Sequence, residues 1–66
     1  MDLRALFKYG RKTVKVYDDG SDWQFVSNDG EQWFTKHSHL AESISLLYAL
    51  DKYTSGSVKL TELDYL

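Results

Sequence analysis

The first half of the chain alternates short apolar segments with polar turns. Residues 13–17, 23–27 and 32–36 are rich in β-branched and aromatic side chains, a composition typical of strands. The connections between them contain Asp19-Gly20 and Asp29-Gly30, and an Asp-Gly pair suits the positive φ angles of a tight hairpin turn. Parallel strands need crossovers of about a dozen residues or more, which these connections are too short to supply. The pattern therefore predicts an antiparallel meander of three strands.

The same turns predict which side chains share a face of the sheet. If the first Asp-Gly pair is a two-residue loop, Val16 lies opposite Trp23. If the second pair is another, Phe25 lies opposite Phe34. The predicted core face then carries Val14, Val16, Trp23, Phe25 and Phe34, and the opposite face carries Thr13, Lys15, Tyr17, Gln24, Val26, Trp33 and Thr35. A three-residue second loop would exchange Trp33 and Phe34 between the faces, because a shift of one residue turns every side chain over.

Residues 38–56 have the period of an amphipathic helix. The apolar stripe follows the spacing i, i+4, i+7, i+8 and comprises Leu40, Ile44, Leu47 and Tyr48, widened by Ala41, Leu46 and Leu50. Ser38 is the expected N-cap, and Ser55-Gly56 is the expected stop. We therefore expect one α+β domain over residues 1–66, in which a single helix packs on the three-stranded antiparallel meander.

The two ends of the chain each fit more than one structure. Near the N-terminus, Leu3, Leu6 and Phe7 have the spacing of a short helix, whereas Leu3, Ala5 and Phe7 alternate like a strand. Near the C-terminus, Val58 and Leu60 alternate, and the phase breaks before Leu63 and Tyr65. That segment is expected to add a strand or a turn to an edge of the sheet.

The overall composition excludes several classes of protein. Apolar residues make up 42% of the 66 residues and charged residues 27%, a globular balance. Ten acidic against eight basic side chains give a net charge of −2, which excludes a strongly basic nucleic-acid arm. The absence of cysteine excludes a disulfide scaffold and thiolate zinc sites, and favours a reducing, cytoplasmic location. No apolar run approaches the roughly 18–20 residues of a membrane span, so no membrane association is expected.

Few side chains point to catalysis. His37 and His39 flank the start of the expected helix, and histidine is the usual acid, base or metal ligand at neutral pH. Two solvated histidines at a strand–helix junction explain the same pattern, since no third metal ligand follows at a fixed spacing. The chain contains no Gly-x-Ser-x-Gly motif and no glycine-rich phosphate loop. We expect neither an enzyme nor a cofactor.

Residues 51–62 resemble the twelve-residue calcium loop of the EF-hand family. Asp51 falls at the first position of that loop, Ser55 at the fifth, Gly56 at the turn glycine and Glu62 at the bidentate end, and Ser57 adds a further hydroxyl. Tyr53 departs from the family, because it stands where an Asp or Asn usually supplies an oxygen ligand. The competing interpretation is a helix C-cap that runs into a strand.

Two functions follow from the surface that this fold leaves open. The first is a small, non-enzymatic regulatory module that binds a protein partner or itself through the aromatic outer face of the sheet, with Lys15, Tyr17, Val26 and Trp33 as the contact residues. Small, cysteine-free, acidic domains of this kind are common among regulators that phages and other mobile elements encode. The alternative is nucleic-acid binding through the basic residues Arg4, Lys8, Arg11, Lys12 and Lys15, with Trp33 or Tyr17 stacking on bases.

Overall fold

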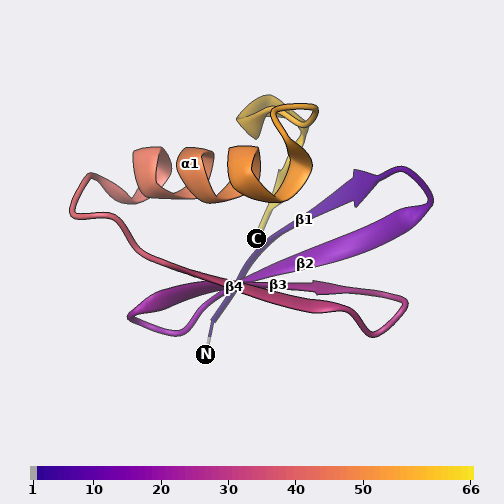
Figure 1. Cartoon of the computed structure of the whole chain (residues 1–66), viewed down its shortest axis with the longest axis horizontal. Helices are drawn as coiled ribbons and strands as arrows, with labels where there is room; N and C mark the ends of the chain where they lie inside the picture. The colour runs from indigo at the N-terminus through magenta and orange to yellow at the C-terminus, as the bar shows by residue number, and fades with distance from the viewer. Residues whose placement is uncertain (1) are drawn as a thin grey trace.

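The computed structural model describes residues 2–66 and contains a five-stranded antiparallel sheet with one α-helix on one face. The elements are β1 (Asp2–Tyr9), β2 (Lys12–Asp18), β3 (Asp22–Ser27), β4 (Gln32–Lys36), α1 (Glu42–Thr54), the 3₁₀ turn η1 (Leu60–Glu62) and β5 (Asp64–Tyr65). The strands lie in the order β4-β3-β2-β1-β5. Figure 1 shows α1 and the C-terminal segment above the sheet, and no other element of residues 2–66 lies on its opposite face. The α+β class is confirmed, whereas a meander of three strands underestimates the sheet.

Of the two N-terminal alternatives, the strand forms. β1 pairs with β2 along nearly its whole length, and Gly10 at φ 63° closes the turn between them. The alternation buries Ala5 and Phe7 on the helix-facing side. The register shifts between Leu3 and Ala5, so a β-bulge interrupts the alternation. Leu3 consequently faces away from the core, opposite Tyr17.

The first predicted hairpin is correct in its faces and wrong in its register. Val16 lies opposite Phe25, two residues from the predicted partner Trp23. The Asp19 amide donates to the Asp22 carbonyl at 3.2 Å, so the two-residue loop is Gly20-Ser21. The Asp19 carboxylate holds this loop because it accepts the amides of Ser21 and Asp22 at 3.1 and 2.7 Å. A shift of two residues preserves the side-chain alternation.

The second predicted hairpin is wrong by one residue. Trp33, and not Phe34, lies opposite Phe25, so Trp33 faces the helix and Phe34 faces outward. The loop has three residues, 28–30, because the Ser27 amide donates to the Glu31 carbonyl at 2.9 Å. Gly30 has φ 93° at the third loop position, where three-residue hairpin loops favour glycine. The Asp29 carboxylate accepts hydrogen bonds from the Ser27 hydroxyl and the Glu31 amide, which further fixes the turn.

The predicted helix forms, but with a different N-terminus. α1 begins after Ala41, which has no side-chain capping bond. Ser38 does not cap the helix, since its amide donates to the Ser45 hydroxyl at 3.0 Å and its hydroxyl accepts the Leu40 amide at 3.3 Å. The predicted stop is confirmed: Ser55 adopts the left-handed conformation at φ 54°, followed by Gly56 at φ 78°.

α1 buries Leu46 and Leu50, which widen the predicted stripe, but not Ile44 and Tyr48, which belong to its centre. Leu40, Ile44 and Tyr48 are exposed, at 50%, 42% and 51%. The buried residues of α1 are Ser45, Leu46, Ala49, Leu50 and Thr54. α1 carries apolar residues on more than one side, and Ser45 selects the buried side because its hydroxyl accepts the Trp23 indole N–H at 2.9 Å.

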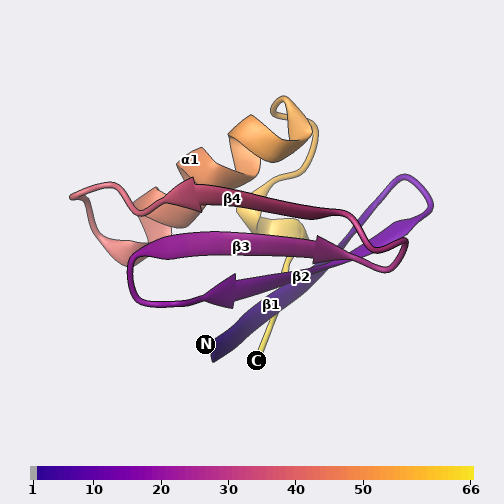
Figure 2. The same ribbon diagram turned by 60° about the horizontal axis from the view of Figure 1, so that its bottom comes forward.

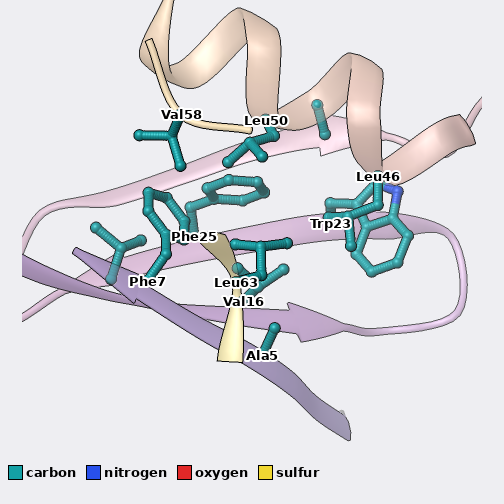
Figure 3. Packing of buried hydrophobic residues seen from close by; sticks show 11 residues of the cluster. Ala5, Phe7, Val16, Trp23, Phe25, Leu46, Leu50, Val58 and Leu63 are labelled. Atoms are coloured by element: carbon teal, nitrogen blue, oxygen red, sulfur yellow. The ribbon is translucent and has the colours of Figure 1, made fainter. Parts of the chain in front are cut away.

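The hydrophobic core lies between α1 and the upper face of the sheet (Figure 3). Figure 3 shows Phe25 beneath Leu50, with Phe7 and Val58 at one end and Trp23 with Leu46 at the other. Trp23 and Phe25 are 1% and 0% exposed, so the two aromatic rings on β3 anchor this core. The C-terminal segment contributes Val58 and Leu63, both buried, and then pairs β5 with Ala5 and Leu6 of β1. Both predicted forms, a turn and a strand, therefore occur there.

Candidate interaction surface

The face of the sheet opposite α1, here called the outer face, is built from two rows of side chains that cross four strands. One row runs through Leu3, Tyr17, Gln24 and Phe34, and the other through Leu6, Lys15, Val26 and Gln32. Figure 2, in which the order β4-β3-β2-β1 can be followed, shows α1 and η1 on the far side of the sheet. No element of residues 2–66 covers these rows.

The outer face keeps three of the four predicted contact residues. Lys15, Tyr17 and Val26 lie on it as expected. Trp33 does not, because the three-residue turn before β4 directs its ring into the aromatic cluster beneath α1. Its ring meets Phe25 edge-on at 5.3 Å and lies 5.4 Å from the ring of Tyr53. The predicted role of Trp33 as an exposed contact residue is therefore wrong.

Phe34 takes the place that the sequence assigned to Trp33. Its side chain is 52% exposed, and its backbone lies directly across from Gln24. Gln24 is only 8% exposed although it lies on the outer face, between the neighbouring positions of Tyr17 and Phe34. The bulge in β1 adds Leu3 to the same surface, and Leu6 lies there by the regular alternation after the bulge. The alternative loop length was the one sequence signal that could have identified Phe34.

The predicted basic residues do not gather on one surface. Arg4 points toward the helix side, where its guanidinium lies 3.4 Å from both Asp18 and Glu42. Lys12 pairs with Asp29 and Glu31, each at 3.4 Å. The remaining three divide between the turn and the outer face: Arg11 lies in the β1–β2 turn, and Lys8 and Lys15 lie on outward-facing positions of β1 and β2.

The acidic side chains of the turn between β3 and β4 form hydrogen bonds and ion pairs with neighbouring residues. The Ser27 hydroxyl, the Glu31 amide and Lys12 lower the pKa of Asp29 from 3.8 to about 2. Tyr53 donates its hydroxyl to Glu31 at 2.9 Å. Burial of the ring, followed by this bond to a carboxylate, raises the pKa of Tyr53 to about 12. These acidic side chains therefore stabilise the turn.

The side chain of His37 is packed and hydrogen-bonded at the end of the sheet away from the acidic turn between β3 and β4. Its ring stacks on Trp23 with a centroid separation of 4.3 Å, and its Nε2 lies 3.0 Å from Asp18. The Gly20 amide, His37 and Arg4 together hold the pKa of Asp18 below its ordinary value of 3.8. His39 is exposed and lies outside this cluster. The two histidines are thus not brought together.

Two of the side chains in the calcium-loop resemblance have other hydrogen-bond partners. The Ser57 hydroxyl donates to the Thr54 carbonyl at 2.7 Å, and the Glu62 carboxylate accepts the Lys59 amide at 3.3 Å. Asp51 is the residue whose carbonyl accepts the Gly56 amide at the helix end. Within residues 2–66, no three His, Asp or Glu side chains gather as they would around a metal ion. The segment forms a helix C-cap and a 3₁₀ turn, and Ser55 is the left-handed C-cap residue.

A second group of exposed apolar side chains comprises Ile44 and Tyr48 on α1 and Leu40 in the segment before it. It is here called the helix stripe. No helix in the described part of the chain, residues 2–66, has the length and apolar character needed to cross a membrane. Neither surface can be assigned by comparison: no family model matches the sequence, and no curated protein or solved structure matches it either.

Proposed function

We propose that this protein is a small, non-enzymatic interaction module that binds a protein partner, or a second copy of itself, through the outer face. The observation that carries the proposal is the uncovered row of Leu3, Tyr17, Gln24 and Phe34 across four strands. A two-layer domain buries one face of its sheet beneath the helix, and its other face is usually polar. A row of apolar and aromatic side chains on that face is typical of an interface.

The outer face is favoured over the helix stripe because its two rows of side chains extend across four strands. Its side chains stand on hydrogen-bonded strands, so few backbone motions must be arrested on binding. It also alternates apolar residues with Lys15 and Gln32, which is the mixed composition of a protein–protein interface. Of the helix stripe, Ile44 and Tyr48 lie on α1, and Leu40 lies in the segment before it.

A matched pair of substitutions tests the proposal. Tyr17→Lys charges the centre of the outer face, and Ile44→Lys charges the helix stripe. Each protein carries an affinity tag and is used to capture partners from a lysate of the cells that naturally produce it. Sedimentation velocity of the purified protein measures self-association. The proposal expects binding or self-association to fall at least about tenfold, close to 1.4 kcal/mol, for Tyr17→Lys and to persist for Ile44→Lys. Loss with Ile44→Lys alone would transfer the function to the helix stripe.

One observation supports nucleic-acid binding as a second candidate. Lys8 and Lys15 lie on the same face as Tyr17, so a strand of nucleic acid could place phosphates and bases on this sheet together. This candidate predicts affinity for short single-stranded oligonucleotides that falls steeply as salt is raised, because phosphate contacts release counterions. Fluorescence anisotropy across a salt series separates it from protein binding, and no affinity at low salt would exclude it.

A further inference from the structure

One edge of the sheet ends in unpaired hydrogen-bonding groups. β4 is the last strand in the order, and no element of residues 2–66 pairs with its outer side. The Glu31 carbonyl accepts the Ser27 amide at 2.9 Å, and the His37 amide donates to the carbonyl of Ser21, just before β3, at 3.0 Å. Since these groups alternate along a strand, the N–H and C=O of Gln32, Phe34 and Lys36 point away from the sheet.

A second copy of β4 satisfies these groups in one register. If Phe34 lies on a two-fold axis opposite its own copy, Gln32 lies opposite the Lys36 position of the other chain, and the reverse. All three outward-facing residues are then used, and each opposed pair exchanges two hydrogen bonds. No like charges are opposed, whereas a register that opposes Lys36 to itself would place two ammonium groups together.

The same register also completes the outer face. The exposed Phe34 rings, each 52% accessible, would meet across the axis as an aromatic cross-strand pair. The row from Leu3 through Tyr17 and Gln24 would continue into its copy and double in length. Edge strands that proteins keep monomeric are usually blocked by proline, by bulges or by several charges. β4 has neither proline nor a register shift, and its charged residue is Lys36.

We propose that the partner is a second copy of this chain, and that two β4 strands pair antiparallel about Phe34 to form one continuous sheet. The inference rests on the proposed function, because Phe34 belongs both to the outer face and to the β4 edge. The ladder is short, so the dimer forms in a concentration-dependent equilibrium.

Cross-linking tests the register directly, since the chain has no native cysteine. In the proposed dimer, positions 32 and 36 of opposite chains are a hydrogen-bonded pair with Cα atoms about 5.5 Å apart. That distance suits a disulfide. Position 32 and its own copy are four residues out of register, about 14 Å apart. A mixture of Gln32→Cys and Lys36→Cys proteins under mild oxidation should therefore give a mixed disulfide dimer, whereas either protein alone should remain largely monomeric.

Sedimentation equilibrium supplies the second readout. Phe34→Lys opposes two ammonium groups on the axis and should abolish a dimer that the control Ile44→Lys retains. Monomeric wild-type protein at the highest soluble concentration, or equal cross-linking in the single and mixed reactions, would overturn the inference. If association persists in Phe34→Lys but is lost in Tyr17→Lys, the inference fails while the proposed function of the outer face stands. If neither variant changes binding or association, both fail.

Discussion

A single residue in one turn decides whether Trp33 or Phe34 faces the helix and which of the two rings is exposed. The Asp-Gly pair before β4 is compatible with a two-residue or a three-residue loop, and the sequence does not distinguish them. In the structure Gly30 occupies the third position of the longer loop. Trp33 therefore packs on Phe25 and Tyr53, and Phe34 stands on the outer face.

The register of β4 predicts how much folding stability is lost when the ring of Trp33 or of Phe34 is removed. Trp33→Ala removes a ring from the aromatic cluster and should approach the roughly 3–5 kcal/mol typical of large aromatic truncations, the cost also expected for Trp23→Ala. Phe34→Ala should cost less than about 1 kcal/mol, because the ring is half exposed. Urea unfolding of the three variants measures the differences. A greater loss for Phe34→Ala would show that β4 is out of register.

The Asp29 carboxylate predicts a pH dependence of stability. Its pKa is lowered from 3.8 to about 2 in the folded protein, so its contribution is complete above pH 4 and is lost as the pH falls toward 2. Asp29→Asn should unfold at lower urea than the wild type at pH 7, and the gap should close between pH 4 and pH 2. A gap that is constant across this range would contradict the role of Asp29 as an ionised acceptor in the turn.

At the scale of elements, the sequence was informative about where strands and helices lie and less so about their orientation. β2, β3 and β4, together with the stop of α1, follow from β-branched runs and glycine positions. The orientation of α1 does not, because Leu40, Ile44 and Tyr48 have as regular a spacing as Leu46 and Leu50. Tertiary contacts, including the bond from Trp23 to Ser45, decide between the two stripes.

Two helix substitutions test this orientation. Leu50→Ala removes a fully buried side chain and should cost about 2–5 kcal/mol. Ile44→Ala should change stability by no more than about 0.5 kcal/mol, because the side chain is 42% exposed and alanine favours the helix. Thermal or urea unfolding of the pair measures both effects. Equal costs would mean that the side chain of Ile44 is buried as deeply as that of Leu50.

At the scale of the whole molecule, the sequence predicts the outer face, although it wrongly assigns Trp33 to it. Tyr17, Val26 and Lys15 share a face in any register that preserves their alternation. The completion of that face by Leu3 and Leu6 could not be foreseen, because a helix and a strand both fit the N-terminal pattern and only the long pairing with β2 selects the strand. The free edge of β4 is likewise a consequence of the strand order, which the local sequence does not encode.

The central claim is that the outer face and the β4 edge together form the association surface of this protein. Amide hydrogen exchange, followed by NMR at increasing protein concentration, tests it most directly. We expect the amides of Gln32, Phe34 and Lys36 to exchange fast in dilute solution and to become protected as the concentration rises, while the amides of Trp33 and Thr35 are protected throughout. Protection that does not change with concentration at these three amides, together with protection that rises along α1, would contradict it.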